Sequence, residues 1–405
     1  MRGERNVSRR RFLAQAAALA AGAAVARAVD EIVELPFENG ARPLVKYPQK
    51  RPLLRVTSRP PQLETPFAVF NEGVITPNDA FFVRYHLTLS PPAEEALVPE
   101  KFRLEIKGKV NSPLTLSVDD LKKFDAAEVV AVNQCSGNSR GFFKPRVSGG
   151  QLGNGAMGNA KWKGVRLKDV LAKAGVAAGT KQVTFNGLDG PLVPQTPDFV
   201  KALNIDHALD GECLLAYEMN GEDLPWLNGY PLRLIVPGHY GTYWVKHLNE
   251  ITVVDDQYKG YWMDPAYRIP DNEGACVEPG TKPSKTVPIA RFNVRSFITS
   301  LADGDQMKAN EDAKIKGIAF DGGYGIREVL FSEDGGKSWR EAELGKDLGK
   351  YSFREWTIPF TPKPGKHALK VKATNRIGQS QPMEPLWNPA GYMRNVVETV
   401  NVTAA

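Results

Sequence analysis

Cysteine and histidine are scarce in this chain of 405 residues, which contains three cysteines and five histidines. The cysteines form no C-x-x-C-H motif, so the sequence excludes a covalently attached c-type haem, and the usual spacings of structural zinc sites are absent. No segment is long and apolar enough to span a bilayer, so we expect no membrane insertion. Because the number of cysteines is odd, at least one thiol stays unpaired.

Positive charge is concentrated at the start of the chain. The formal net charge is +6, but residues 1–28 contain six arginines and a single acidic residue, Glu4. The rest of the chain is therefore nearly neutral, at about +1. This balance offers no electrostatic basis for binding nucleic acid, so we expect no such partner.

Residues 1–28 have the layout of an export signal. An arginine run at positions 9–11 precedes an apolar, alanine-rich stretch that ends in an A-x-A cleavage pattern at positions 26–28. The paired arginines indicate the twin-arginine route, which exports folded proteins. We therefore expect a periplasmic protein that receives a cofactor before export; a basic, disordered tail is the alternative.

The remaining chain divides into three parts. Residues 29–78 are proline-rich and show little periodicity, which predicts an extended arm laid over a domain. Residues 79–278 mix strand and helix patterns, and after a linker rich in Gly, Pro and Lys, residues 279–405 show strand patterns alone. We expect an α+β protein, with a mixed α/β domain followed by an immunoglobulin-like β-sandwich.

Local patterns predict individual elements in both domains. In the first domain we expect strands at 102–108, 129–132, 182–185 and 232–236, and helices that begin at an N-cap on Ser117 and within 165–171. In the last part we expect strands at 290–299, 313–320, 327–332, 352–358 and 367–373.

One cysteine stands in an unusual setting. The predicted strand at 129–132 leads into a small, polar turn, Gln-Cys-Ser-Gly-Asn-Ser-Arg, at positions 134–140. Arg140 follows Cys135 by five residues, and nearby positive charge lowers the pKa of a thiol and favours the thiolate, which attacks electrophiles and binds metals. The alternative is that Cys135 is a small, buried hydrophobic residue.

Other polar residues occur beside predicted strands. In the segment 81–87, Arg84 and His86 are two residues apart and would face the same side of an extended chain; an exposed strand end is the alternative. Asp189 lies in a glycine-bounded turn and Tyr258 near another, where ordinary turn chemistry is the alternative.

These motifs, in this order, resemble those of the sulfite oxidase family of molybdenum enzymes. The series comprises the Arg-x-His strand, the Gln-Cys-x-Gly-Asn-x-Arg loop, the Gly-Leu-Asp turn, Leu-Leu-Ala-Tyr-Glu-Met-Asn-Gly at 214–221, and the Tyr-Pro-Leu-Arg, Pro-Gly-x-x-Gly, Trp-Val-Lys and Tyr-Lys-Gly motifs. The segment at 214–221 is very specific at its length, and the resemblance covers most of the chain after residue 28.

The resemblance implies a cofactor and its contacts. The Cys135 thiolate would bind molybdenum together with the two dithiolene sulfurs of one molybdopterin, a role that suits a soft ligand. Further cofactor contacts are implied for Phe82, Val83, Arg84, Tyr85, His86, Asp189, Asn228, Arg233, Trp244, Val245 and Lys246. Animal members of the family often carry histidine at the position of Asn228, and a pocket tryptophan where this chain has residues 148–155, so the pocket wall differs here.

The resemblance also places four residues at an anionic substrate: Arg84, Arg140, Tyr258 and Arg394. Guanidinium groups suit a small oxyanion because they form charge-assisted hydrogen bonds in a fork. The implied activity is oxidation of sulfite to sulfate by oxygen-atom transfer. Electrons would pass to a separate c-type cytochrome, and the C-terminal sandwich would join a homodimer.

Three alternatives compete with this activity. The first is a reductase of sulfoxides such as protein methionine sulfoxide, which resembles only the first domain. The second is a nitrate reductase, which in this superfamily adds haem and flavin domains. The third is a non-catalytic binding protein built on the sandwich, which Cys135 with its arginine and tyrosine partners argues against. Of the other cysteines, we expect Cys213 in the core and Cys276 as a free surface thiol.

Overall fold

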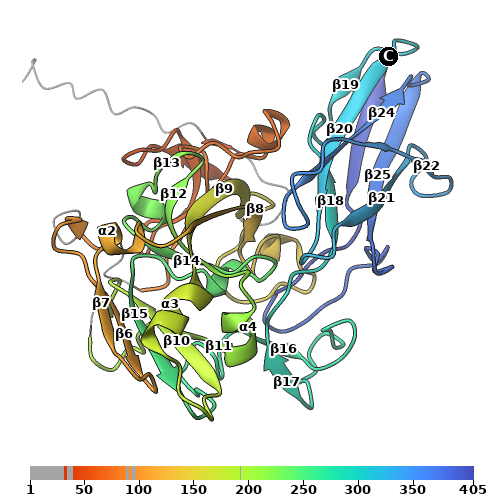
Figure 1. Ribbon diagram of the computed structural model, residues 1–405. Helices are drawn as coiled ribbons and strands as arrows, with labels where there is room; N and C mark the ends of the chain where they lie inside the picture. Colours follow the sequence, from red (N-terminus) through yellow and green to blue (C-terminus); the bar gives the residue numbers. More distant parts are fainter. Residues whose placement is uncertain (1–31, 34–39, 88–90, 94–96, 192) are drawn as a thin grey trace, which may run out of the picture.

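The computed structural model describes residues 32–33, 40–87, 91–93, 97–191 and 193–405 (Figure 1). The expected export signal at residues 1–28 lies outside these described residues. Figure 1 shows a broad first domain and, in blue, a narrow C-terminal sandwich beside it. None of the described helices has the length and apolar character that crossing a membrane requires.

Three sheets build the first domain. Their strand orders are β1–β2–β3–β4–β5, then β11–β10–β15–β6–β7, and β13–β12–β9–β8 with β14 paired to β12. The bounds are β1 (Ile32–Val33), β2 (Arg42–Val45), β3 (Leu53–Thr57), β4 (Gln62–Glu64), β5 (Val83–Arg84), β6 (Leu104–Gly108), β7 (Leu114–Leu116), β8 (Ala126–Gln134), β9 (Met157–Arg166), β10 (Gln182–Gly187), β11 (Lys201–Asn204), β12 (Leu214–Met219), β13 (Glu222–Asp223), β14 (Arg233–Ile235) and β15 (Leu248–Val254). A hairpin of β16 (Arg268–Pro270) and β17 (Thr286–Pro288) follows.

The expectation of a mixed α/β first domain needs correction, because the structure is mostly β. Among the described residues the α-helices are short: α2 (Val118–Leu121), α3 (Leu167–Ala174) and α4 (Ile205–Leu209). Ser117 caps α2 as predicted, since its hydroxyl accepts the amide hydrogen of Asp120 at 3.0 Å. The helix expected within 165–171 begins only at Leu167, because β9 continues to Arg166 in pairing with β12.

The proline-rich segment also differs from the predicted arm. Its described part forms strands β1 to β4, and β4 pairs with β5 through Gln62↔Arg84 and Leu63↔Val83. These strands are only two to five residues long, too short for an alternating pattern to show in the sequence. This sheet holds β5, and therefore Arg84, in place.

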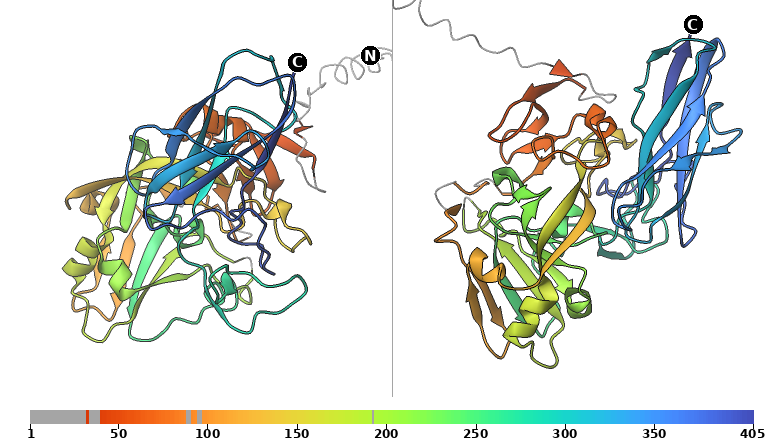
Figure 2. Two further views of the ribbon diagram at one scale, coloured as in Figure 1. Left: turned by 90° about the vertical axis from the view of Figure 1, so that its right-hand side faces the viewer. Right: turned by 45° about the horizontal axis from the view of Figure 1, so that its top comes forward.

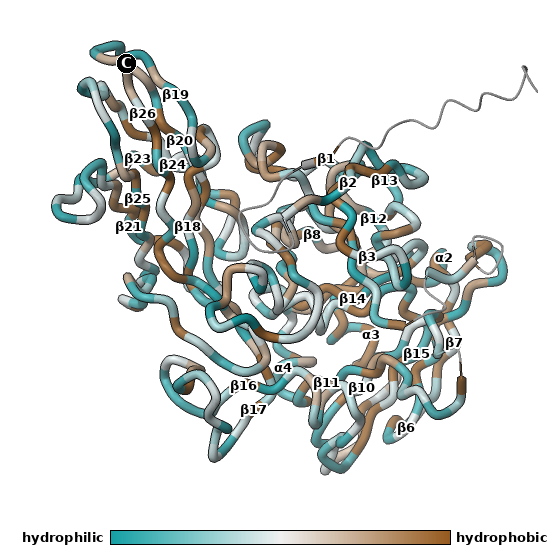
Figure 3. The backbone as a smooth tube through the Cα atoms, turned by 180° about the vertical axis from the view of Figure 1, so that it is seen from behind, coloured by the Kyte–Doolittle hydropathy of each residue, from teal (hydrophilic) through white to brown (hydrophobic). Residues whose placement is uncertain are grey.

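Two sheets form the C-terminal part, in the orders β18–β20–β24–β23 and β19–β26–β25–β21–β22 (Figure 2). The bounds are β18 (Arg295–Ile298), β19 (Gln306–Met307), β20 (Ala313–Phe320), β21 (Ile326–Ser332), β22 (Arg340–Glu341), β23 (Glu343–Leu344), β24 (Arg354–Phe360), β25 (Gly365–Asn375) and β26 (Thr399–Ala404). Apolar residues of both sheets form one core. Figure 3 shows their hydrophobic positions along the strands and hydrophilic turns between them. The five predicted strands occur, β20 with the predicted ends and the other four with shifted ends, whereas the short edge strands and β26 were not predicted.

A continuous core joins the sandwich to the first domain. Aromatic rings of the 3₁₀ helix η1 (Phe67–Asn71) pack edge-on against sandwich rings, with centroid distances of 5.5 Å for Phe67–Phe297 and 6.0 Å for Phe70–Phe353. The large first-domain core therefore extends into the sandwich. This contact fixes the sandwich beside the end of β8.

Candidate active site

Cys135 lies directly after β8, at the end of the longest antiparallel pair in the first domain. β8 and β9 pair without interruption from Ala126↔Val165 to Gln134↔Met157, and the amide of Cys135 donates to the carbonyl of Ala156 at 2.9 Å. The Cys135 side chain is 9% exposed and lines a cavity of about 40 Å³. The thiol is thus held on a strand end, at the wall of this cavity.

Glycines make room for Arg140 beside this thiol. A Cβ atom on Gly137 would lie 2.7 Å from the Arg140 guanidinium, and one on Gly149 would lie 2.9 Å from it. The guanidinium also lies over the ring of Tyr392, 5.0 Å from its centroid. Arg140 is therefore enclosed next to the cavity rather than among the residues that line it.

The segment after residue 80 presents alternate side chains to the cavity. Phe82, Arg84 and His86 line it, as the spacing predicts. Val83 and Tyr85 instead pack into a separate core, where they are 2% and 0% exposed.

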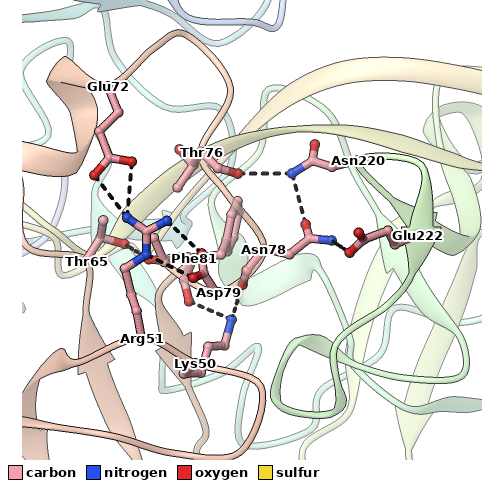
Figure 4. A network of polar contacts seen from close by, with 11 residues as sticks. Lys50, Arg51, Thr65, Glu72, Thr76, Asn78, Asp79, Phe81, Asn220 and Glu222 are labelled. Carbon is pink, nitrogen blue, oxygen red and sulfur yellow. Dashed lines mark hydrogen bonds and ion pairs between the residues drawn. The ribbon is translucent and has the colours of Figure 1, made fainter.

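Buried side chains hold the backbone of this segment. Lys50 Nζ donates to the carbonyl of Phe81 at 3.0 Å, and Lys246 Nζ donates to that of Arg84 at 2.7 Å. Figure 4 shows Lys50 and Arg51 bound to the turn that precedes residue 81. Arg51 forms ion pairs with Glu72 and Asp79, each at 2.9 Å. These contacts fix the direction in which Arg84 points.

Positive charge dominates the cavity wall. Arg84, Arg233 and Lys246 line it, and Asp189 is the one carboxylate among its described lining residues. Burial lowers the pKa of Lys246 to about 7 and that of Arg233 to about 9, because nearby negative charge offsets only part of the cost of burying each cation. The cavity is therefore suited to an anionic ligand.

Several polar atoms of the wall lack a partner. Within the described part of the chain, the buried atoms Asn133 Oδ1, Ser136 Oγ, Thr242 Oγ1 and Arg233 Nε have no hydrogen-bond partner, and all four residues line the cavity. Burying such groups unpaired costs roughly 1–3 kcal/mol each. A ligand with many donors and acceptors would satisfy them.

Comparison with known proteins decides the family. Residues 90–262 match the model of the oxidoreductase molybdopterin binding domain, and residues 286–405 match that of the Mo-co oxidoreductase dimerisation domain. The mitochondrial sulfite oxidase of Mus musculus is 34% identical over 386 residues, which cover 91% of this chain and 68% of the relative. The chain belongs to the sulfite oxidase family.

Other members and a solved structure agree with this assignment. Sulfite oxidase of Arabidopsis thaliana is 30% identical over 384 residues, covering 89% of this chain and 96% of the relative. The crystal structure of the sulfane dehydrogenase SoxCD from Paracoccus pantotrophus has the same fold, with a TM-score of 0.73 at 23% identity and 90% of each chain covered. As a family member, this chain is a molybdenum oxidoreductase with a molybdopterin cofactor.

The cavity fits such a cofactor. Its cationic wall suits the phosphate of molybdopterin, its unpaired amide and hydroxyl groups suit the pterin edge, and the Cys135 sulfur suits the metal. Asn228 also lines the cavity; its side-chain carbonyl oxygen accepts a hydrogen bond from Lys50 at 2.5 Å and its amide donates to Phe82 O at 3.1 Å.

Most of the predicted cofactor residues meet at this cavity. Those that line it are Phe82, Arg84, His86, Asp189, Asn228, Arg233, Trp244 and Lys246. The side chains of Val83, Tyr85 and Val245 lie in the protein core instead. The hydroxyl of Tyr85 bonds to His247 Nε2 at 2.7 Å, so these residues support the wall from behind.

The tyrosine that faces the cavity is not the predicted one. Tyr258 is absent from the described cavity lining, whereas Tyr267 lines it and its hydroxyl is hydrogen-bonded to His86 Nε2. Burial raises the pKa of Tyr267 and lowers that of His86, so both are neutral at pH 7. Tyr267 has a positive φ of 57° just before β16, a position that no strand or helix pattern indicates.

Arg394 also lies away from the cavity lining. Its guanidinium is paired with Glu398 and lies 5.3 Å from the centroid of the Phe142 ring, beside a different surface hollow. Its predicted place at the substrate therefore finds no support in this arrangement.

A residue that the sequence did not indicate connects the sandwich to the cysteine loop. Arg295 begins β18, is 1% exposed, and donates from Nη2 to the hydroxyl of Ser139 at 2.9 Å. The same nitrogen lies 3.6 Å from a carboxylate oxygen of Glu398. Only the folded chain brings this arginine to a loop 156 residues away, so no local pattern reveals it.

Proposed function

We propose that this protein oxidises sulfite to sulfate: sulfite and water give sulfate, two protons and two electrons. The observation that carries the proposal is the placement of the Arg84 side chain in the same cationic cavity as the Cys135 thiol. When bound, the molybdenum cofactor supplies oxygen-atom transfer and accepts the electrons. Arginine beside the reactive centre favours a small oxyanion over a neutral sulfoxide.

The side chains of the cavity divide the remaining work. Arg84 neutralises and orients the dianion, while Lys246 holds the Arg84 carbonyl at 2.7 Å and so fixes the segment that carries it. The His86–Tyr267 pair adds hydrogen-bonding groups without negative charge that would repel sulfite. Arg140, enclosed beside the loop, adds positive potential near Cys135.

The setting of the reaction is part of the proposal. The arginine-rich start of the sequence supports export to the periplasm by the twin-arginine route. A separate c-type cytochrome is the electron acceptor that we propose. The match to a dimerisation domain supports a homodimer. Two facing sheets with a common core support an immunoglobulin-like sandwich.

Metal analysis of the purified protein, coupled to sulfite-dependent reduction of cytochrome c or ferricyanide, tests the proposal. We expect about one molybdenum per chain and reduction that depends on sulfite. The same preparation is assayed with reduced dye and methionine sulfoxide. Bound molybdenum with sulfoxide reduction and no sulfite oxidation would overturn the proposal.

A further inference from the structure

A second group of potential metal ligands lies outside the active-site cavity. His207 is on α4, Asp210 follows this helix, and Cys213 immediately precedes β12. One potential ligand atom of each residue lies within 4.8 Å of those of the other two. The spacing H-x₂-D-x₂-C is not a familiar zinc pattern, so no sequence motif indicated this group.

The histidine nitrogen of this group lacks a hydrogen-bond partner. Considering the described residues, His207 Nε2 is buried and unpaired, and it lies 3.8 Å from Asp210 Oδ2. That separation is too long for a hydrogen bond. It is close to the distance of about 3.4 Å between two ligands of one tetrahedral zinc ion with bonds of about 2.1 Å.

A second imidazole packs against the first. The ring of His239 is 8% exposed, and its centroid is 4.4 Å from that of His207. Its Nδ1 atom is also buried without a partner within the described chain. Two neighbouring imidazoles with an unpaired nitrogen each are unusual in a protein interior, where buried polar atoms are normally bonded.

The charge around the group favours a cation. The acids Asp210 and Glu212 place negative charge beside the Cys213 thiol, while Arg291 acts in the opposite direction. A divalent ion would deprotonate the thiol and balance the two negative ligands.

We propose that His207, Asp210 and Cys213 bind one Zn²⁺ ion, with water in the fourth position. Imidazole, carboxylate and thiolate together are zinc ligands, and four ligands in a tetrahedron match its preference.

The ion would brace the junction between the two domains. His239, which packs on His207, forms an isolated bridge with Arg291, between β17 and β18, and Glu212, next to Cys213, accepts hydrogen bonds from Lys350 and Tyr351 on the sandwich side. The neighbours of the cluster therefore connect the first domain to the C-terminal part. The cluster is separate from the cavity, because none of its three ligands is among the cavity lining residues.

The test uses the molybdenum-loaded, tag-free protein, titrated with Zn²⁺ against a chromophoric chelator. We expect about one zinc per chain, and at least tenfold weaker binding in Cys213→Ser and His207→Gln. Cys276→Ser is the matched control, because Cys276 is a partly exposed free cysteine outside the cluster. Molybdenum content should be unchanged in all variants. No stoichiometric zinc in the unaltered protein, or equal affinity in Cys213→Ser, would overturn the proposal.

A second readout covers the case in which those variants do not fold. Asp210→Asn should fold, because the new side chain has the same shape and the position is 34% exposed. This variant should also weaken zinc binding about tenfold. Co²⁺ in place of zinc should give a thiolate-to-cobalt absorption band in the near ultraviolet, retained in Cys276→Ser. A protein that binds Co²⁺ without this band would contradict ligation by Cys213.

Discussion

Two arginines predicted for the same anionic substrate have opposite surroundings in the structure. Arg84 lines the cavity beside Cys135, in a wall where cations outnumber carboxylates. Arg394 is paired with Glu398 and stacked on an aromatic ring near the C-terminus. A guanidinium whose charge is already matched has little attraction left for a small anion. The comparison shows that neighbouring charge, more than residue type, decides which arginine can recognise substrate.

The comparison depends on the cavity being the reaction centre, and Cys135→Ser tests that directly. We expect turnover of sulfite to fall by about 10³-fold or more, because a hydroxyl is a poor ligand for a metal that prefers thiolate. Sulfite-dependent reduction of ferricyanide measures it. Cys276→Ser should keep its activity. A Cys135→Ser variant with an unaltered rate would place the chemistry elsewhere.

Substituting each of the two arginines in turn tests the comparison itself. Arg84→Gln should raise KM for sulfite by about 10²-fold, since one bidentate contact worth ~3 kcal/mol is lost. Arg394→Gln should change KM by less than about threefold, with a lower melting temperature because Glu398 loses the nearer of its two arginine neighbours. Steady-state kinetics and thermal unfolding separate the two effects. Equal increases in KM would remove the distinction.

The two tyrosines can be compared in the same way, with a smaller effect. Tyr267→Phe should lower kcat about tenfold, because loss of one hydrogen bond to His86 is worth ~1–1.5 kcal/mol. Tyr258→Phe should stay within about twofold, since Tyr258 is not among the described cavity residues. The reverse ranking would show that Tyr258 acts in the reaction and Tyr267 does not.

The last expected effect is on stability rather than on turnover, and it concerns the buried lysines. Burial lowers the pKa of Lys50 and Lys246 from 10.5 to about 7, so the folded, cofactor-free chain holds fewer protons than the unfolded chain between these values. Its free energy of unfolding should therefore rise with pH from about 7 to 10.5, by at most about 1.4 kcal/mol per pH unit for each lysine, and level off below pH 7.

Urea unfolding at pH 7 and pH 9 measures this slope. The cofactor-loaded protein should show a weaker slope, because an anionic ligand restores the charged form of Lys246, which lines the cavity. If the unfolding free energy depends equally on pH with and without cofactor, the charge of these lysines is not linked to anion binding. Lys173, which is on the distant helix α3, provides a control variant, Lys173→Met.

The sequence anticipated what local geometry controls. Alternation along an extended segment brought Arg84 and His86 to one side, and a strand followed by a polar turn brought Cys135 to a cavity. The ends of strand β20 were predicted as observed. The order of motifs indicated the family before any side chain was placed.

Residues set by long-range packing were not anticipated. Tyr267 lies in an irregular turn, and Arg295 comes from the sandwich, so each reaches the site through folding of distant segments. The pairing of Arg394 with Glu398, which the sequence did not reveal, likewise neutralises a charge that we had expected at the substrate. The helices of the first domain were overestimated because short apolar runs fit strand and helix alike.

The contact between Arg295 and Ser139 limits how this protein can be recombined. A domain is often treated as a module that evolution or an engineer can exchange at the linker. Here the second module supplies a buried arginine that steadies the loop of the first, so a replacement sandwich must also carry that side chain. A graft chosen for assembly alone would loosen the cysteine on which chemistry depends.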